Sequence, residues 1–339
     1  MFTLSEAERE AVLVPELAAL TERHREACAP YRRVLDALGA RGPHERLVDL
    51  PWLPVRMFKT HELRSVPEDE VFRVLISSGT TGQRPSRIYL DREAAAAQTR
   101  MLAATLRVVL GERRLPMLVV DSRSVLRDPT LSARGAGVLG MMNFGRDHTF
   151  VLDERGRVDA EAVKGFLARH GGGRFLIFGF TFMVWQCLLD LGVDLSQGVL
   201  IHSGGWKRLA EQAVGNAEFR RRLEAECGLT AVHNFYGMVE QIGTVFLEGP
   251  AGDGLYCPDF ADVVIRDPET WREAPVGVPG LVEVVSTLPT SYPGHVLLTE
   301  DLGVVRGVDD GVWPGKRFEV LGRLPRAEAR GCSDTMGRG

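Results

Sequence analysis

Helix patterns and strand patterns alternate along the chain from Asp91 to Gly237. Residues 91–111 have the composition of a helix, with an aspartate near its start and a glycine after its end, and residues 115–121 (LPMLVVD) have that of a buried strand. Further patterns of both kinds follow at 159–171, 174–180, 182–192, 198–205, 215–228 and 230–237. Strands that are connected by helices pair in parallel and are covered by those helices. The alternation therefore predicts an α/β fold with a mostly parallel, helix-covered sheet.

The segments on either side of this region predict other structures. Leucines at helical spacing in residues 5–40 predict two or three short helices that are interrupted by Pro15 and Pro30, and residues 49–59 (DLPWLPVRMFK) read as an extended connection. From about residue 254 onward, short β-rich runs between Gly/Pro turns predict an antiparallel β subdomain. We therefore expect a helical N-terminal segment packed on the core (1–70), an α/β core (71–253), a smaller β subdomain (254–323) and a mobile tail (324–339).

The composition disfavours several classes of partner. The chain has 339 residues and a formal net charge of −4, which leaves no excess of positive charge for nucleic acid or an anionic membrane. No run of 18 apolar residues occurs, so no membrane span is expected, and the acidic start FTLSEAEREA differs from a signal peptide. Five cysteines without a CxxC pair argue against a disulfide framework or a zinc ribbon. These features predict a cytoplasmic globular protein whose partner is a small molecule.

The stretch LISSGTTGQRPSRIYL (75–90) contains more small and hydroxylated residues than a change of chain direction requires. The β-rich runs at 71–76 and 87–90 flank it, so we expect a loop between two strands. Backbone N–H groups, serine and threonine hydroxyls, and the guanidinium groups of Arg84 and Arg87 form a set of donors that suits phosphate oxygens. Neither GxxxxGK[ST] nor GxGxxG occurs in this loop. The stretch is thus a candidate phosphate-binding loop, with an unusually hydroxylated structural turn as the alternative.

Five segments, in order, resemble those of the adenylate-forming ligases, which include acyl-CoA synthetases, adenylation domains and luciferases. SSGTTGQRPS is similar to the phosphate loop of that superfamily, HSGGWKRL to its adenine-side segment, NFYGMVEQ to its Tyr-Gly-x-Thr-Glu segment, LLTEDLG to its Thr-Gly-Asp segment and VLGR to its hinge. The blocks LPVRMFK, YPGHVLLTEDLG and EARGCSDT narrow the resemblance to the acyl-protein synthetase (LuxE) family, over about residues 51 to 335. The resemblance implies the N-terminal-domain fold of these ligases, with the small C-terminal domain absent or reduced to a tail.

The resemblance also implies an activity. A ligase of this family uses ATP and Mg²⁺ to activate a fatty acid as acyl-AMP, takes the acyl group onto a cysteine near its C-terminus, and passes it to a reductase. We therefore expect a small-molecule carboxylic acid as substrate, bound with ATP by the core at 71–253, and an acyl-accepting reductase or carrier as protein partner. Two alternatives stay open. One is an acid ligase of secondary metabolism that passes an aryl or other acyl group to CoA, an amine or a carrier thiol, and the other is a non-catalytic nucleotide-binding protein.

Most of the candidate site residues belong to the expected ATP site. The resemblance implies that the β- and γ-phosphates are held by Ser77, Ser78, Gly79, Thr80, Thr81 and Gly82, with help from Arg84 or Arg87. It implies an adenine-side wall made by Gly204, Gly205, Tyr236 and Gly237, with Met238 beside them. Glu240 would bind Mg²⁺, Asp301 would accept from the ribose hydroxyls, and Arg323 would contact ribose or phosphate. The structural alternatives are that the acidic residues are solvated or cap a backbone end, and that the glycines only make turns. Val239 stands where the superfamily usually has a threonine.

Three further residues are candidates for the chemistry itself. Lys207 or His233 would neutralise charge at the α phosphate or the carboxylate, since the catalytic lysine of the large ligases has no counterpart in this chain; a surface lysine and a structural histidine are the alternatives. Cys332, in the tail, would be the acyl acceptor, because arginines nearby favour the thiolate and nine residues after Arg323 span at most roughly 30 Å. A free tail cysteine without a role is the alternative. The other four cysteines read as core or incidental, and residues 141–145 and 178–185 as an acyl tunnel or plain core.

Overall fold

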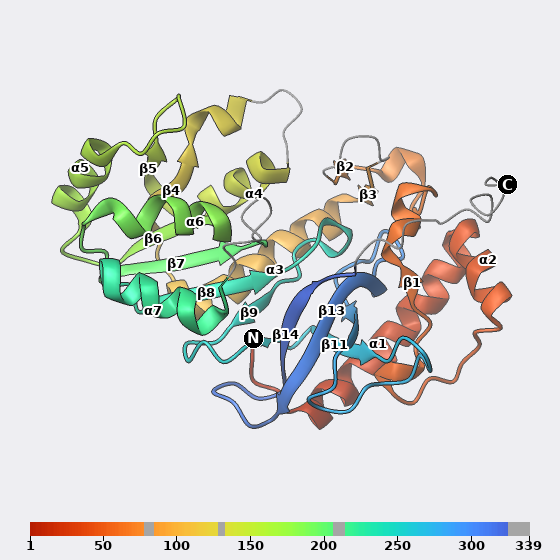
Figure 1. Cartoon of the computed structure of the whole chain (residues 1–339). Helices are drawn as coiled ribbons and strands as arrows, with labels where there is room; N and C mark the ends of the chain where they lie inside the picture. The colour runs from red at the N-terminus through yellow and green to blue at the C-terminus, as the bar shows by residue number, and fades with distance from the viewer. Residues whose placement is uncertain (78–84, 128–132, 206–213, 325–339) are drawn as a thin grey trace, which may run out of the picture.

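The computed structural model describes residues 1–77, 85–127, 133–205 and 214–324 (Figure 1). Its α-helices in these ranges are α1 (Glu6–Ala27), α2 (Ala29–Leu38), α3 (Arg92–Leu110), α4 (Ala133–Met142), α5 (Ala160–His170), α6 (Thr181–Leu188) and α7 (Asn216–Cys227). Its short 3-10 helices include η1 (Leu47–Asp49), η2 (Val55–Lys59), η3 (Glu68–Glu70), η4 (Arg123–Arg127), η5 (Leu189–Leu191) and η7 (Val239–Gln241).

The strands in the described ranges form one large and one small sheet. They are β1 (Leu53–Pro54), β2 (Arg73–Ile76), β3 (Arg87–Leu90), β4 (Leu115–Ser122), β5 (Gly145–Leu152), β6 (Phe175–Phe180), β7 (Gly198–Ser203), β8 (Ala231–Tyr236), β9 (Phe246–Glu248), β10 (Leu255–Tyr256), β11 (Ala261–Arg266), β12 (Gly280–Ser286), β13 (Val296–Val308) and β14 (Lys316–Arg323). The large sheet has the order β11-β12-β13-β14-β10-β9-β8-β7-β6-β4-β5, with β1 paired to β13, and β2 and β3 form the small sheet.

One half of the large sheet is parallel and covered by helices on both faces, which confirms the predicted α/β class. β8, β7, β6, β4 and β5 pair in parallel. On one face, apolar side chains of these strands pack with α5, α6 and α7, and on the other face with α3 and α4. Met141 of α4 and Phe178 of β6 are both buried members of the core on this second face.

The other half of the large sheet is antiparallel, as the sequence predicts for the strands after residue 254. β11, β12, β13 and β14 pair in succession as antiparallel neighbours. β14 then pairs with β10, β10 with β9, and β9 with β8 of the parallel half, all in antiparallel orientation. The structure thus joins the two halves edge to edge, and the junction lies where β8 meets β9.

The N-terminal helices differ from the sequence prediction at Pro15. α1 runs without a break through Pro15, although an interior proline removes a backbone hydrogen bond and usually costs about 3 kcal/mol. The helix continues because Leu13 and Leu17 bury completely against β11, β12 and β13. Pro30 lies in the first turn of α2, where proline is well tolerated. The predicted interruption at Pro15 is therefore wrong, while a new helix does begin beside Pro30, at Ala29.

The connection at 49–59 is extended only in part. β1 pairs in parallel with β13, but the residues that follow it form η2. This turn of 3-10 helix buries Phe58 to 1% exposure, with its ring 6.0 Å from that of Tyr292. The burial of one aromatic ring overrides the extended conformation that the prolines predict.

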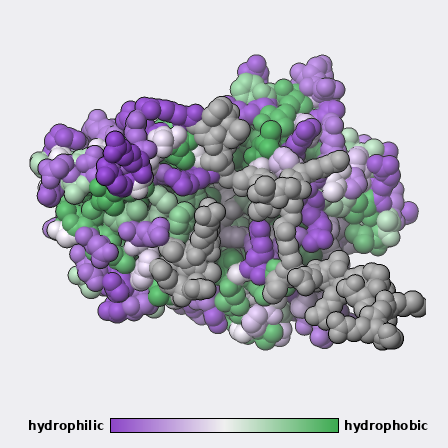
Figure 2. Space-filling view, turned by 45° about the horizontal axis from the view of Figure 1, so that its top comes forward, coloured by the Kyte–Doolittle hydropathy of each residue, from purple (hydrophilic) through white to green (hydrophobic). Residues whose placement is uncertain are grey.

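In the view of Figure 2, hydrophilic and hydrophobic side chains are interspersed over the coloured part of the surface. Within the described ranges, no helix is both long and apolar enough to cross a bilayer.

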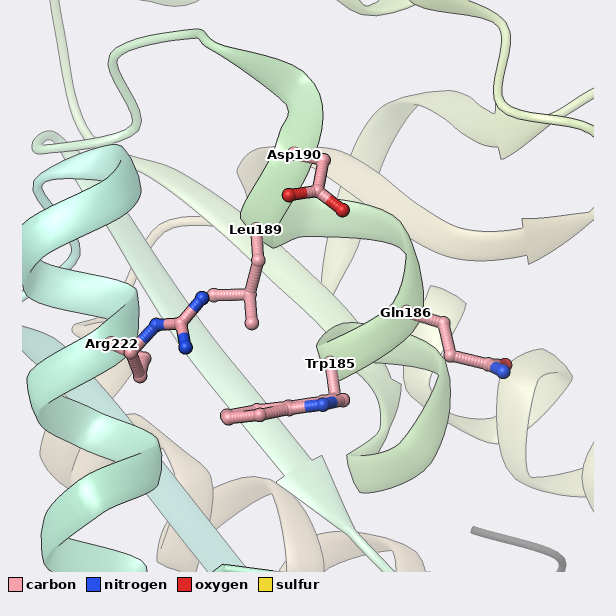
Figure 3. A pocket seen from close by; sticks show the side chains of 5 residues that line it. All are labelled: Trp185, Gln186, Leu189, Asp190 and Arg222. Atoms are coloured by element: carbon pink, nitrogen blue, oxygen red, sulfur yellow. The ribbon is translucent and has the colours of Figure 1, made fainter. Parts of the chain in front are cut away.

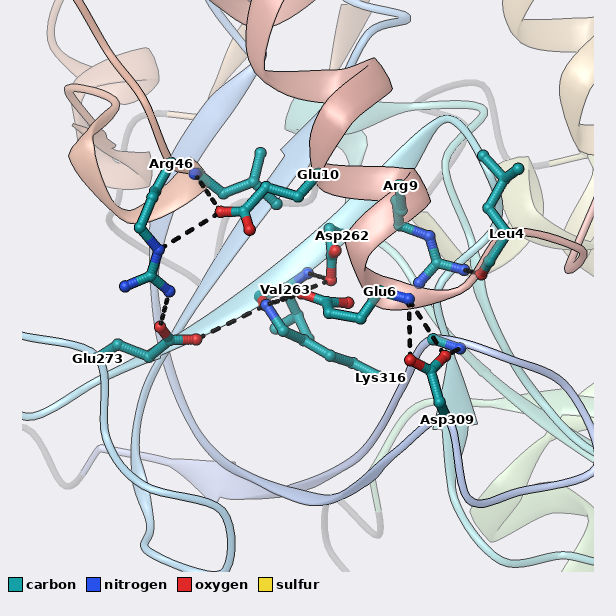
Figure 4. Close-up of polar contacts among 12 residues, drawn as sticks. Leu4, Glu6, Arg9, Glu10, Arg46, Asp262, Val263, Glu273, Asp309 and Lys316 are labelled. Atoms are coloured by element: carbon teal, nitrogen blue, oxygen red, sulfur yellow. Dashed lines mark hydrogen bonds and ion pairs between the residues drawn. The ribbon is translucent and has the colours of Figure 1, made fainter.

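A buried ionic cluster fastens α1 to the antiparallel half (Figure 4). Lys316 of β14 is 6% exposed, and its ammonium group lies 3.0 Å from Glu6, 3.7 Å from Asp262 and 3.7 Å from Glu273. It also donates to the carbonyl oxygen of Val263 at 2.9 Å. Burial and the carboxylate of Asp262 raise the pKa of Glu6 to about 7, and the positive charges of Lys316 and Arg9 offset this only in part.

This cluster predicts a pH dependence of stability. The ordinary pKa of a glutamate is about 4.5, so between pH 4.5 and 7 the folded protein holds a proton on Glu6 that the unfolded chain releases. The contribution of Glu6 to stability therefore falls as the pH rises through this window. We expect Glu6→Gln to remove this pH-dependent loss. The free energy of unfolding of the variant should therefore rise by about 1–2 kcal/mol relative to that of the wild type as the pH increases from 5 to 8. Urea unfolding at each pH measures the difference, and parallel curves for the two proteins would contradict it.

Candidate functional site

Ser77 and Ser86 hold the two ends of the glycine-rich stretch together. β2 and β3 are antiparallel, with Ile76 opposite Arg87, which confirms that the stretch lies between two strands. The N–H of Ser77 donates to the carbonyl oxygen of Ser86 at 3.0 Å, and the N–H of Ser86 donates to Ser77 Oγ at 2.8 Å. The side chain of Arg87 is exposed at the start of β3. The paired serines therefore fix where the intervening residues leave and rejoin the small sheet.

Glu240 lies on η7 and is anchored to this pair. Its carboxylate is 8% exposed, and Ser86 Oγ donates to its Oε1 atom at 2.5 Å. Its Oε2 atom accepts no hydrogen bond from the described residues. The backbone is confined as well, since a Cβ atom on Gly294 would lie 2.7 Å from the Glu240 carbonyl oxygen. The carboxylate is thus oriented by one neighbour and keeps one oxygen for a ligand.

Tyr236, Asp301 and Arg323 form a second group of polar side chains. Asp301 of β13 lies opposite Arg323 of β14. Tyr236 Oη donates to Asp301 Oδ2 at 2.7 Å, and Arg323 Nε donates to Asp301 Oδ1 at 3.3 Å. Burial and the Asp301 carboxylate raise the pKa of the Tyr236 phenol well above its usual range, so its hydroxyl stays protonated and donates. The structure thus brings together three residues that the sequence predicts for ATP binding.

Two sets of contacts beside Asp301, those of Thr299 and those of Glu300, are not predicted from the sequence. Thr299 Oγ accepts from the N–H of Asp301 at 3.1 Å and donates to the carbonyl oxygen of Val282 at 2.7 Å, which fixes the backbone at Asp301. Glu300 accepts from Arg56 of η2 at 2.5 and 3.0 Å. The threonine in LLTEDLG could have indicated the first contact. Arg56 is 244 residues from Glu300, and only the fold shows that contact.

The predicted glycines on the adenine side have backbone reasons for their identity. Gly204 ends β7 with a φ of +83°, a conformation that favours glycine. A Cβ atom on Gly237 would lie 3.0 Å from the carbonyl oxygen of Thr244, so the close approach of two chain segments requires glycine there. Among the described residues, no atom lies within 4 Å of a Cβ atom placed on Gly205, so no such reason is found there. Met238 precedes η7 and packs against the core.

His233 is not brought to either group. Its ring is 5% exposed, and Nδ1 is hydrogen-bonded to the carbonyl oxygen of Glu248 at 3.0 Å. Burial lowers the pKa of His233. Since side chains alternate along a strand, His233 and Tyr236 lie on opposite faces of β8. The described contacts of His233 are those of a structural histidine.

Two surface hollows lie away from the predicted site. The first has a volume of about 420 Å³ between α6 and α7, with Arg222 5.5 Å from the ring centre of Trp185 (Figure 3). Its lining residues are Trp185, Gln186, Leu189, Asp190 and Arg222. The second, of about 510 Å³, is lined by Asp147, His148, Thr149, Arg169 and His170. The first hollow includes Trp185, from the segment 178–185 that the sequence predicts to be an acyl tunnel or plain core, and neither hollow includes a residue of the predicted ATP site.

Several predicted site residues lie outside the described ranges. They are Ser78, Gly79, Thr80, Thr81, Gly82, Arg84, Lys207 and Cys332. The described part of the predicted site therefore consists of the ends of the loop, the Glu240 anchor, and the group around Asp301.

Comparisons with known proteins identify the family. The model of the acyl-protein synthetase LuxE family matches residues 1–339. The chain belongs to this family. It is 25% identical over 327 residues to the long-chain-fatty-acid–luciferin-component ligase of Vibrio harveyi, covering 90% of this chain and 82% of the relative. It is 22% identical to the ligase of the same name from Aliivibrio fischeri, over 85% of this chain and 78% of that protein.

Solved structures share the fold of this acyl-protein synthetase family member. A 2-hydroxyisobutyryl-CoA ligase in complex with 2-HIB-AMP superposes with a TM-score of 0.68 at 19% identity, covering 95% of this chain and 69% of that one. ATP-bound MatB from Rhodopseudomonas palustris has a TM-score of 0.51 at 20% identity, over 76% of this chain and 49% of its own. These similarities confirm the predicted adenylate-forming ligase fold.

Proposed function

We propose that this protein uses ATP to activate a long-chain fatty acid as acyl-AMP, transfers the acyl group to its own Cys332, and delivers it to a partner protein such as a reductase. Membership of the acyl-protein synthetase family supports the reaction class, and the names of the two bacterial relatives support the fatty acid. The observation that carries the proposal is the meeting of Asp301 and Arg323 with Tyr236, which lies four residues before Glu240 in the chain.

The group around Asp301 is suited to the ribose of ATP. A carboxylate is a strong acceptor for hydroxyl donors, and Asp301 is 16% exposed in its side chain, so a ligand can reach it. Thr299 fixes its backbone, and Tyr236 fixes one of its oxygens. Arg323 is 72% exposed and can turn from Asp301 to a phosphate at little cost, because exposed ion pairs are weak. Gly204, Gly205, Gly237 and Met238 would leave room for the base.

The loop and Glu240 are suited to the phosphates and Mg²⁺. The residues between Ser77 and Ser86 would donate to the β- and γ-phosphates, with Arg87 adding charge. Mg²⁺ in ATP sites is commonly held by one or two carboxylates together with phosphate oxygens. Glu240 fits this role because its Oε2 atom is free of partners among the described residues. When bound, the ion would neutralise phosphate charge and orient the leaving pyrophosphate.

The proposed reaction consists of two nucleophilic steps. A carboxylate oxygen of the fatty acid attacks the α phosphorus, a new P–O bond forms, and the bond to pyrophosphate breaks. The thiolate of Cys332 then attacks the acyl carbonyl, a thioester forms, and AMP leaves with the bond electrons. Lys207 is proposed to neutralise charge at the α phosphate or the carboxylate. His233 receives no role, because its described contacts are structural.

The proposal is tested with the full chain, ATP, Mg²⁺ and a panel of fatty and aryl acids. We expect labelled pyrophosphate to exchange into ATP only when an acid is present, and most rapidly with long-chain fatty acids. We also expect a labelled fatty acid to remain on the denatured protein until hydroxylamine releases it. Exchange with aryl acids alone, without label on the protein, would instead support an acid ligase with a diffusible acceptor. Nucleotide binding without exchange would support a non-catalytic protein.

A further inference from the structure

Ser86 contacts two segments that the proposed function requires at the same moment. Its side chain is fully buried. Its backbone N–H and carbonyl group are both bonded to Ser77, at the other end of the glycine-rich stretch. Its hydroxyl donates to Glu240 Oε1, 154 residues further along the chain. One residue therefore contacts both Ser77, at the start of the stretch, and the carboxylate of Glu240.

The geometry indicates that Ser86 and Glu240 restrain each other's positions. A separation of 2.5 Å is typical of a charge-assisted O–H···O⁻ hydrogen bond, which is stronger than a neutral one. η7 packs against β3, directly after Ser86, and Gly294 confines the Glu240 backbone from the other side. Neither Ser86 nor Glu240 can shift far without the other. A glutamate without such a partner would lose rotamer freedom when it binds a ligand.

We propose that Ser86 is a positioning residue that orients the Glu240 carboxylate for metal binding. By holding Oε1 it fixes the direction of Oε2, so the carboxylate is already oriented when the nucleotide and its cation arrive. Partners that orient a metal ligand in this way typically contribute about 10- to 100-fold to metal affinity. This inference rests on the proposed function, and it gives a role to Ser86, the last residue of the segment SSGTTGQRPS, which is not among the residues predicted to bind ATP.

The test measures cation binding without turnover. Mn²⁺ serves as the probe, in the presence of a non-hydrolysable ATP analogue, and electron paramagnetic resonance counts the free ion. We expect Ser86→Ala to weaken Mn²⁺ binding about tenfold. Binding of the analogue without metal should change less than twofold. We expect Ser86→Ala to add little to the loss in Glu240→Gln, because both changes remove the same oriented oxygen.

Ser291→Ala is the matched control. Ser291 is also fully buried, and its hydroxyl donates to the carbonyl oxygen of Tyr89 on β3 at 2.9 Å, so the variant loses one buried hydrogen bond from the same region. We expect it to bind Mn²⁺ as the wild type does. Thermal unfolding of both variants confirms that they are folded. Equal loss in the two variants, or wild-type affinity in Ser86→Ala, would refute the positioning role of Ser86 alone. A wild-type protein that binds no Mn²⁺ with the analogue would instead refute the proposed function.

Discussion

Cys332→Ser is expected to abolish acyl labelling of the protein while acid-dependent pyrophosphate exchange continues at a rate close to that of the wild type. Adenylation needs only ATP, the acid and their binding groups, so the thiol is not required for that step. Formation of the thioester requires a thiolate, and a serine hydroxyl is far too weakly acidic to replace it. Labelled fatty acid on the denatured protein measures the second step, and exchange measures the first.

The other four cysteines provide the control for this prediction. Cys28, Cys187, Cys227 and Cys257 are buried and free. Burial raises the pKa of each thiol, to about 11 for Cys187 and for Cys227. A buried thiol that stays protonated is a poor nucleophile. Cys187→Ser is the control and should keep its label, and label that persists in Cys332→Ser would show that another residue accepts the acyl group.

Glu240→Gln is expected to lower acid-dependent pyrophosphate exchange by about 10²–10³-fold. The substitution keeps the size of the side chain and an acceptor oxygen for Ser86, but it removes the negative charge that would hold Mg²⁺. The loss should therefore shrink as the Mg²⁺ concentration rises, and a titration of rate against Mg²⁺ measures this.

Glu300→Gln is the control for this second prediction. Glu300 lies next to Asp301, and its ion pair with Arg56 is near the surface. We expect the exchange rate to stay within about threefold, since exposed ion pairs contribute about 0–1 kcal/mol. A similar loss in both variants, or a loss in Glu240→Gln that Mg²⁺ does not relieve, would contradict the role of Glu240 as a metal ligand.

The sequence predicted those elements whose pattern is local. Asp91 caps α3, with its carboxylate accepting from the N–H of Ala94 at 2.7 Å, and Gly111 follows the end of that helix. The predicted apolar runs became the parallel strands β4, β6, β7 and β8, whereas β5 was not predicted, and the runs after residue 254 became antiparallel strands. Prediction failed at Pro15 and at η2, where the burial of leucine and phenylalanine side chains against distant strands outweighed local preference.

What the sequence by itself determined is the kind of chemistry, because hydroxyls, glycines and carboxylates in a fixed order restrict what a chain can bind. It predicted Glu240, Tyr236, Asp301 and Arg323 as site residues through the resemblance of short segments to those of the family. What only the tertiary structure decided is which groups touch. The bond from Ser86 to Glu240 and the bond from Tyr236 to Asp301 join segments far apart in the chain. Such contacts depend on how the small sheet, η7 and the antiparallel strands pack, and no local pattern of residues encodes that packing.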